Sequence, residues 1–409
     1  MMSFEISLLQ FVAFLDLLAV GLIVPLIPNH VKQMGGSQLY IGLLGSIYAG
    51  FQLGAGPLIG SLSDIRGRKP ILLLTLLVCS VAYMTLGLTS SIAIIFVLRA
   101  VLGLFKQTQL LTKALVPDYE KVESKQSQIY GKMAAISGVG ITLGPIFGGH
   151  IVEDYPHYGF TIIGAIVSTF FLINAGLIYM LPKTDCIIKT KAQTKDVSQN
   201  FFQSLLSGIK QTFVELSKVE WLKYWKIFMF QALNSFAMGV YYSSYALYLK
   251  TQFGLTPKNI GYVVSIQGVI GAISSFLMGR INSLYVHDKD YSIRNNHVFL
   301  LLSTSLLGIC LAFNIYMYSI LLIPLAVGNA VGRLVTLEMV LKRSKGDHRG
   351  TLIGASNSVR SLTGVIAPMV AGFIGEFFGI SYVLYASFFS TFVGLIFSYQ
   401  FRSKPSKVD

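Results

Sequence analysis

A single acidic residue interrupts the first long apolar run of the chain. Asp16 lies about nine residues inside this run, which covers residues 7–28. If the run is a helix that enters a bilayer, a rise of about 1.5 Å per residue places the carboxyl group roughly 13 Å deep. An ionisable side chain at that depth is costly and is by default functional. We therefore expect Asp16 to bind a proton or face a substrate, the alternative being a structural ion pair.

Basic residues also lie inside apolar runs. They are Arg99, Lys106, Arg333 and Arg360, and Glu338 lies near the end of one such run. The excess of positive charge favours an anionic or zwitterionic ligand over a simple cation. The alternative is that a backbone carbonyl or the membrane interface satisfies each cation.

The seventh apolar run carries polar and aromatic groups of the kind that line sites for organic ligands. They are Gln231, Asn234, Tyr241, Tyr242 and Tyr245. Tyrosines are also common at membrane interfaces, which is the alternative interpretation. The sequence has no Gly-rich phosphate loop, nucleophile triad or metal-ligand cluster, and its three cysteines are scattered. We therefore expect a protein that is not an enzyme and has no cofactor and no metal site.

The composition sets the class of protein to which these residues belong. The chain has 409 residues, of which 53% are hydrophobic and 12% charged, against about 25% charged in soluble domains. Its apolar runs of about 20 residues are long enough to cross a bilayer core of about 30 Å. They lack the period-2 alternation of barrel strands, so they predict helices. The net charge of +14 does not indicate a nucleic-acid partner, because the basic residues gather in the loops of one face.

Twelve apolar spans can be counted along the chain. They cover residues 7–28, 39–60, 70–90, 92–112, 129–151, 158–181, 226–249, 259–281, 297–315, 317–341, 351–374 and 380–401. An even number of spans places both termini on one side of the bilayer. The basic loops lie on that same side, so the termini are predicted to be cytosolic. Whether the protein resides in the plasma membrane or an internal membrane stays open.

The two halves of the chain repeat weakly. Gly42 and Ser46 match Gly261 and Ser265 at an offset of 219, and Pro145 matches Pro368 at an offset of 223. Such symmetry is typical of duplicated six-helix halves with a substrate path near the midplane. We expect an N-terminal bundle at residues 1–182, a linker with an amphipathic surface helix at 183–225, and a C-terminal bundle with a short tail at 226–409.

A charged hairpin joins the second and third spans. It contains Gly60, Asp64, Arg66, Gly67, Arg68 and Lys69. The first glycine would allow close helix approach and the second a sharp turn. The charges are expected to pair only when the two halves meet on the cytosolic side; the alternative role is a simple positive-inside anchor.

The fifth span carries a glycine pattern. Its members are Gly131, Gly140, Gly144, Pro145, Gly148 and Gly149. Glycines at every fourth position leave one helix face without side chains, so a neighbouring helix can pack backbone to backbone. The proline would bend the helix at that contact.

The hairpin and the glycine pattern resemble the loop signature and the antiporter signature of the major facilitator superfamily. The first span, with Asp16 and the Pro25-x-x-Pro28 exit, is similar to that of tetracycline and drug/proton antiporters, and residues 103–108 look like a group of animal orphan members.

The resemblance implies an all-α membrane protein of twelve helices in two six-helix bundles. It also implies a hairpin that latches the outward-open state, with Asp118 as partner of Arg68. It places the helices of Asp16 and Lys106 side by side, so we expect these two residues to pair. Tetracycline itself is in doubt, because this chain has Ala82 before Tyr83 where those antiporters carry an aspartate.

We therefore predict a secondary carrier of a small organic solute that works by alternating access and exchanges the solute for protons. We expect a monomer whose partners are the solute, protons and the lipid bilayer. Uniport or symport of an organic anion or metabolite is an alternative. Another is a membrane receptor or scaffold that keeps the carrier fold without transporting.

Overall fold

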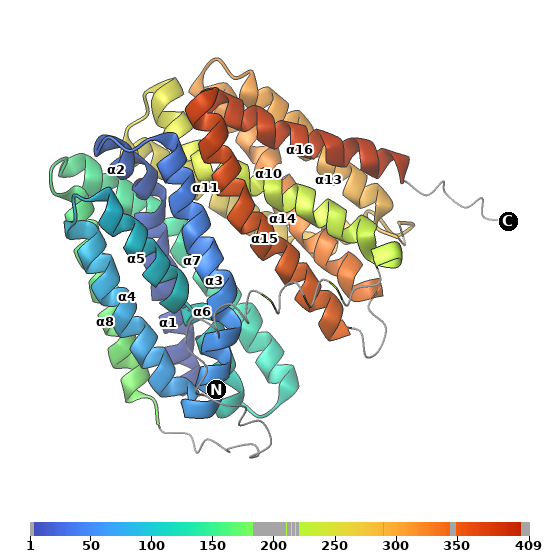
Figure 1. The fold of residues 1–409 in the computed structure, drawn as a ribbon. Helices are drawn as coiled ribbons and strands as arrows, with labels where there is room; N and C mark the ends of the chain where they lie inside the picture. The colour runs from blue at the N-terminus through green and yellow to red at the C-terminus, as the bar shows by residue number, and fades with distance from the viewer. Residues whose placement is uncertain are drawn as a thin grey trace. The chain divides into compact units, whose positions relative to one another are not determined.

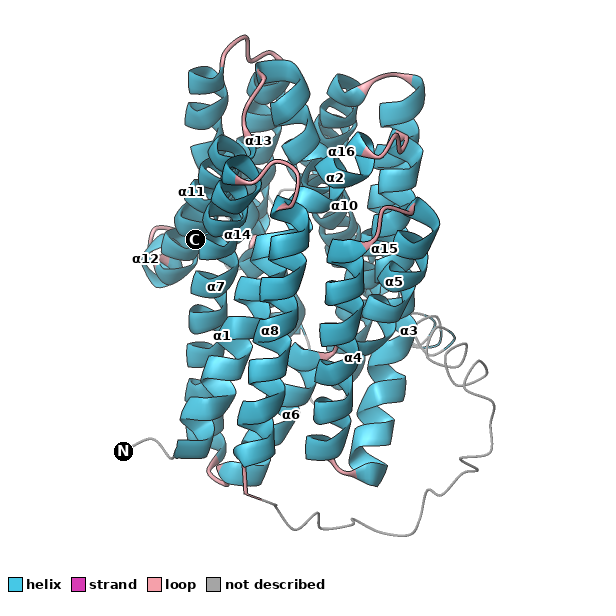
Figure 2. Ribbon diagram, turned by 90° about the vertical axis from the view of Figure 1, so that its left-hand side faces the viewer, coloured by secondary structure: helices cyan, strands magenta, loops and turns pink. Residues whose placement is uncertain are grey.

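The computed structural model describes residues 4–182, 210, 214, 217, 221–288, 290–343 and 349–401 (Figure 1). These described residues form helices joined by short loops, and they contain no strand (Figure 2). The surface helix predicted within residues 183–225 lies outside them, apart from residues 210, 214, 217 and 221–225.

The chain divides into two compact units. Unit 1 comprises Met1–Gly35, Ile47–Gln211 and Thr256–Ser265, and unit 2 comprises Gly36–Ser46, Thr212–Leu255 and Ile266–Asp409. Two helices contribute residues to both units, namely α3 (Gln38–Arg66) and α11 (Pro257–Phe276). Each unit therefore contains the first part of a helix whose remainder belongs to the other unit.

The other helices belong to one unit each. Unit 1 holds α1 (Phe4–Ile23), η1 (Val24–Leu26), α2 (Ile27–Gln33), α4 (Arg68–Leu88), α5 (Ile92–Phe105), α6 (Thr108–Tyr119), α7 (Glu123–Asp154) and α8 (Gly159–Met180). Unit 2 holds α10 (Trp221–Phe253), α12 (Met278–Ser283), α13 (Ser292–Cys310), α14 (Ile315–Arg343), α15 (Arg349–Phe377) and α16 (Ile380–Gln400).

Each of the twelve predicted spans coincides with a helical segment, which in three cases is broken into shorter helices, the eighth span covering parts of α11 and α12. The first span contains α1, η1 and α2, and the fourth contains α5 and α6. Among the described residues, ten segments are long and apolar enough to cross a membrane. α10 and α13 are not among these ten. The first six residues of α13, Ser292 to His297, include one arginine, two asparagines and a histidine, which leaves its apolar part short.

The two units repeat one packing pattern. In unit 1, α1 packs against α7 and α8, while α4 packs against α8 and α5. In unit 2, α10 packs against α15 and α16, while α13 packs against α16 and α14. The shared pattern is the duplication that the sequence offsets predicted.

The shared helices make equivalent contacts in the two units. In unit 2, the Ser46 hydroxyl donates to the carbonyl oxygen of Val365 at 2.6 Å. In unit 1, the Ser265 hydroxyl donates to the backbone carbonyl oxygen of Thr142 at 2.5 Å. Both donors and both acceptors are related by the offsets of the repeat, 219 and 223 residues. Thr142 lies on α7 and Val365 on α15, two helices that are labelled in Figure 1.

Candidate functional site

Asp16 and Lys106 form an ion pair inside unit 1. The Lys106 Nζ lies 2.6 Å from the Asp16 Oδ1, and the two side chains are 5% and 0% exposed. The second carboxylate oxygen accepts a hydrogen bond of 3.0 Å from the Gln109 Nε2. The lysine ammonium also lies 5.6 Å from the centre of the Phe171 ring. The pairing expected from the resemblance is therefore present, and the carboxylate has a partner for each oxygen.

A break in the fourth span places Lys106 in this position. α5 ends at Phe105 and α6 begins at Thr108, and between them Lys106 has a ψ of 63°, which is not helical. Two polar atoms at the break, the Gln107 Nε2 and the Thr108 Oγ1, are buried without a hydrogen-bond partner in the described part of the chain. Broken helices at membrane depth occur where the backbone is buried in protein or lines a watery cavity. The break therefore supplies polar groups that a water molecule or a solute could satisfy.

Arg99 precedes Lys106 in the same span and makes a different contact. Its guanidinium carbon is 4.3 Å from the centre of the Tyr48 ring, a cation–π geometry. Arg99 is only 8% exposed. Tyr48 belongs to the part of α3 that lies in unit 1, and its hydroxyl accepts a hydrogen bond from Gln52. Arg99 thus adds a second buried cation to unit 1.

The two predicted cations of unit 2 are exposed. Arg333 on α14 and Arg360 on α15 interact with each other electrostatically, and Arg333 also interacts with Tyr242. The Tyr242 hydroxyl accepts hydrogen bonds from the Asn329 Nδ2 at 3.0 Å and the Gln267 Nε2 at 3.1 Å. Two arginines beside a polar cluster favour an anionic group as their ligand.

The predicted polar residues of α10 mostly serve packing inside unit 2. The Gln231 side chain exchanges two hydrogen bonds with Ser356 on α15. The Tyr241 hydroxyl bonds that of Tyr318 on α14 at 2.7 Å. Asn234 is 5% exposed, and its amide oxygen has no partner among the described residues. Tyr242 is the most exposed tyrosine of this group, at 42%.

The charged hairpin closes on its own unit. Arg68 donates to Asp118 at 2.8 Å and to the carbonyl oxygen of Ala114 at 2.7 Å, and it lies 3.4 Å from Asp64. All these residues belong to unit 1. Asp118 is the predicted partner of Arg68, and neither of these pairs needs a residue of unit 2. The reason is geometric: the ends of α3, α4 and α6 already lie within reach of one another.

The other hairpin residues differ in their contacts. Gly67 has a φ of 96°, which confirms the sharp turn. Lys69 donates to the carbonyl oxygens of Tyr179 and Leu181 at the end of α8. Arg66 is exposed. The close helix approach expected at Gly60 is absent, because a Cβ there would meet no heavy atom within 4 Å.

A second arginine cluster lies at the start of α13 in unit 2. Arg294 donates to Asp288 at 3.3 Å and to Asn282 at 2.7 Å, and it lies 3.7 Å from Glu338 near the end of α14. Its guanidinium also covers the Tyr291 ring at 4.0 Å. At the offset of 219, Asp64 matches Ser283, so the internal repeat gave no sign of this cluster. The available signal was Arg294 itself, which lies three residues before the ninth predicted span.

Next to this cluster, burial raises the pKa of the Tyr285 hydroxyl above its usual range. The nearby Asp288 carboxylate raises it further, while Arg294 opposes both effects. The Tyr285 hydroxyl also forms a hydrogen bond with the His297 Nδ1 at 2.9 Å. A hydrogen bond of Tyr285 and the ion pair of Arg294 with Asp288 therefore both stabilise the loop before α13.

The glycine pattern on α7 packs against α1 as the small-residue spacing predicts. A Cβ on Gly140 would lie 2.6 Å from the Phe14 carbonyl oxygen, and one on Gly144 would lie 2.6 Å from the Gly21 Cα. Gly148 approaches the carbonyl of Leu22, and Gly149 approaches Pro257 of α11 within unit 1. α7 continues through Pro145. Gly131 meets nothing within 4 Å, so it lies outside this contact.

Comparisons with known proteins fit this architecture. The sequence model of the Major Facilitator Superfamily matches residues 9–285 and 227–409. The tetracycline resistance protein, class H, of Pasteurella multocida is 23% identical over 381 residues, which cover 91% of this chain and 89% of that protein. The quinolone resistance protein NorA of Staphylococcus aureus is 24% identical over 380 residues, with 91% and 90% covered.

A solved structure shares the fold. The crystal structure of the human organic anion transporter MFSD10 (TETRAN) matches with a TM-score of 0.65 and 18% identity, and the match covers 97% of this chain and 100% of that one. The family model and the apolar helices make this chain a multi-pass membrane protein. With its family model matched along nearly the whole sequence, the chain belongs to the major facilitator superfamily, in the group that resembles tetracycline and drug antiporters.

Proposed function

We propose that the chain is a secondary carrier of a small zwitterionic organic solute that works by alternating access and exchanges its solute for protons; cotransport of an organic anion is the second candidate. The observation that carries the proposal is the buried pair of Asp16 and Lys106 at the break between α5 and α6. A scaffold protein needs neither a buried carboxylate nor a broken membrane helix. The drug-resistance proteins among the relatives and the antiporter-like glycine face of α7 support exchange as the mode.

The charge of the solute decides how its binding is coupled to protons. A positively charged group on a zwitterion competes with the proton for the Asp16 carboxylate, so proton and solute bind in turn. This order leads to exchange. An organic anion without such a group competes instead with the Asp16 carboxylate for Lys106, and it binds best when Asp16 is protonated. That order leads to cotransport, which is the second candidate and rests on the 2.6 Å contact of the lysine with the carboxylate.

Unit 2 presents two cations of its own that suit an anionic group. Arg333 and Arg360 are exposed and close enough to repel each other, so an anionic group between them would relieve that repulsion. Tyr242 presents a hydroxyl near Arg333. The structurally similar human protein MFSD10 is an organic anion transporter, which agrees with this class of solute.

Flux into liposomes that contain the purified protein tests the proposal. The zwitterion norfloxacin and the anion carboxyfluorescein serve as probes, with pH gradients imposed in both directions. We expect an acidic interior to drive norfloxacin uptake and an acidic exterior to drive carboxyfluorescein uptake, with both effects lost in Asp16→Asn. A broader library that includes tetracycline should follow. If no solute of the library moves with either gradient, the scaffold alternative gains and the carrier proposal fails.

A further inference from the structure

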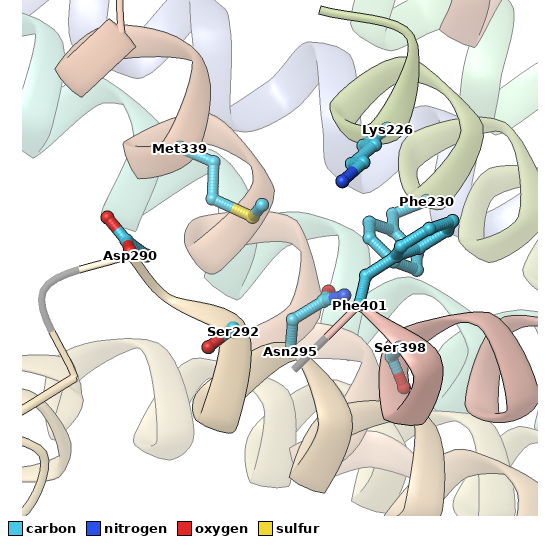
Figure 3. Close-up of a pocket in the computed structure, with 8 residues that line it drawn as sticks. All are labelled: Lys226, Phe230, Asp290, Ser292, Asn295, Met339, Ser398 and Phe401. Carbon is cyan, nitrogen blue, oxygen red and sulfur yellow. The ribbon is translucent and has the colours of Figure 1, made fainter. Parts of the chain in front are cut away.

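A small pocket lies at the end of unit 2 where α10 and α13 begin and where α14 and α16 end (Figure 3). It is lined by Lys226, Phe230, Asp290, Ser292, Asn295, Met339, Ser398 and Phe401. Its volume is about 220 Å³. Pockets for drug-sized ligands measure about 300–1,000 Å³, whereas this one has room for roughly seven waters at about 30 Å³ each. The pocket is therefore large enough for the headgroup of a lipid but not for a whole lipid molecule.

The pocket contains one positive group directed into its interior. In Figure 3 the Lys226 ammonium and the Asn295 amide point toward each other across the space beside Phe401. The Lys226 Nζ lies 4.3 Å from the centre of the Phe401 ring, and no described carboxylate is within ion-pair distance of it. Asn295 is only 3% exposed. A cation with an amide donor beside it is suited to an anionic oxygen group such as a phosphate.

One carboxylate lies at the rim of the same pocket. Asp290 is exposed and precedes the first turn of α13. With Lys226 it makes the charged lining neutral, so a doubly anionic ligand would be repelled while a zwitterion would match both charges. The lysine lies inside the pocket and the aspartate lies at its rim. A zwitterionic ligand would therefore place its anionic end in the interior and its cationic end at the mouth.

Part of the remaining lining is apolar and lies at a helix end. Phe230, Met339 and Phe401 form this part of the wall. The exposed Trp225 contacts Phe401 edge to face, with ring centres 5.4 Å apart. Tryptophan is enriched where membrane helices leave the hydrocarbon core. The pocket thus combines a polar interior with the aromatic surroundings of a membrane surface.

We propose that this pocket binds the headgroup of a zwitterionic amine phosphate, with the phosphate at Lys226 and Asn295 and the ammonium at Asp290. The source of this group is a phospholipid of the ethanolamine type or a soluble ethanolamine phosphate ester. The site is separate from the residues assigned to transport, so its occupancy can be tested without a known solute. A bound headgroup would also connect α10 to the loop that holds the Arg294 cluster, because Asp290 and Ser292 lie between Asp288 and Arg294.

The chain provides its own reporter for this site. Its two tryptophans, Trp221 and Trp225, both lie at the start of α10. In Trp221→Phe protein, the fluorescence of Trp225 reports on the Phe401 ring that lines the pocket. The probes are dihexanoyl phosphatidylethanolamine, dihexanoyl phosphatidylglycerol and glycerophosphoethanolamine, which has the same headgroup without acyl chains.

We expect a saturable fluorescence change with phosphatidylethanolamine and a weaker one with phosphatidylglycerol. Lys226→Gln should weaken binding about tenfold, because a charge-assisted contact is lost. The matched control Lys250→Gln, at the other end of α10, should leave binding unchanged. Asp290→Asn should reduce the preference for phosphatidylethanolamine over phosphatidylglycerol, because the ammonium group loses its carboxylate partner.

The outcomes distinguish a soluble ligand from a membrane lipid, and both from the absence of a site. Equal affinity for glycerophosphoethanolamine and the lipid supports the proposed chemistry with a soluble ligand, whereas tight binding of the lipid alone supports it with a membrane ligand. The proposal is overturned by the absence of any saturable change, or by equal affinities of Lys226→Gln and Lys250→Gln proteins. A preference of the unsubstituted protein for phosphatidylglycerol also overturns it. Thermal melting of each variant establishes that it is folded before titration.

Discussion

The Asp16 carboxylate and the Lys106 ammonium are 2.6 Å apart, and neither side chain is more than 5% exposed. The lysine belongs to a two-residue break between helices, so its position depends on backbone geometry as well as on its own rotamer. A buried ion pair of this kind adds little net stability by itself, but removal of one partner leaves an uncompensated charge. This asymmetry makes the pair testable in two independent ways.

The first prediction concerns stability. Asp16→Asn should lower the free energy of unfolding by about 3–5 kcal/mol, because Lys106 is then buried without a counter-ion. The double variant Asp16→Asn/Lys106→Met should recover most of that loss, since both charges are gone. Denaturation of the detergent-solubilised proteins measures both values. A double variant as unstable as the single one would show that the pair itself is not the cause.

The second prediction concerns the pH dependence of transport by the same carboxylate. Asp16→Glu should keep a pH-dependent flux of norfloxacin or carboxyfluorescein, because the titratable group remains. The double variant Asp16→Asn/Lys106→Met should show a flux that no longer varies with pH. The measurement is initial uptake into liposomes between about pH 4 and pH 8, a range whose lower end is the ordinary pKa of a carboxyl group, about 4. An unchanged profile in the double variant would assign proton coupling to another residue.

The third prediction ranks the partners of Arg68. Asp118 lies 2.8 Å from the arginine with 27% of its side chain exposed, whereas Asp64 lies 3.4 Å away and is 66% exposed. Asp118→Asn should therefore destabilise unit 1 by about 1 kcal/mol, and Asp64→Asn by less, because water screens exposed pairs. Both variants should be compared by thermal melting at low and high salt. A larger effect for Asp64→Asn would mean that this residue acts on a partner outside unit 1.

The fourth prediction uses the glycine face of α7. Gly144→Ala should strongly impair folding, since its Cβ would come within 2.6 Å of the Gly21 Cα. The matched control is Gly131→Ala on the same helix, where a Cβ meets nothing within 4 Å. The control should be neutral or stabilising by up to about 1 kcal/mol, because alanine favours the helix over glycine. Yield and melting temperature of the two proteins provide the comparison; equal behaviour would rule out the close helix contact.

The fifth prediction concerns the charge of the solute. Arg360→Gln should weaken transport of carboxyfluorescein about tenfold more than that of a neutral analogue, because a charge-assisted contact exceeds a neutral one by about 1–2 kcal/mol. Arg280→Gln, an exposed arginine of the same unit, is the control and should have no such selectivity. Competition by unlabelled anions measures the effect. Equal losses for charged and neutral solutes would assign Arg360 a structural role.

The sequence by itself determined the features that depend on local composition and period. Twelve apolar spans, the turn at Gly67 and the glycine face at Gly140 and Gly144 were all predicted, because each follows from residue types a few positions apart. The duplication was also visible. The offsets that relate Ser46 to Ser265 reappear as two equivalent hydrogen bonds, one in each unit.

Only the tertiary structure decided which side chains meet, because that depends on the rotation of each helix about its own axis. Gln231 and Tyr241 were expected beside a ligand, yet they bond to Ser356 and Tyr318 on neighbouring helices. Arg294 gathers Asp288, Asn282 and Glu338 from segments up to 56 positions apart along the chain, as the Asn282–Glu338 bond illustrates. The break at Lys106 was likewise not predicted, although the polar residues 106–109 interrupt the fourth span at this point. A change of helix rotation or register moves a polar group from the bundle interior to the surface without changing the hydropathy of the span, so composition cannot reveal it.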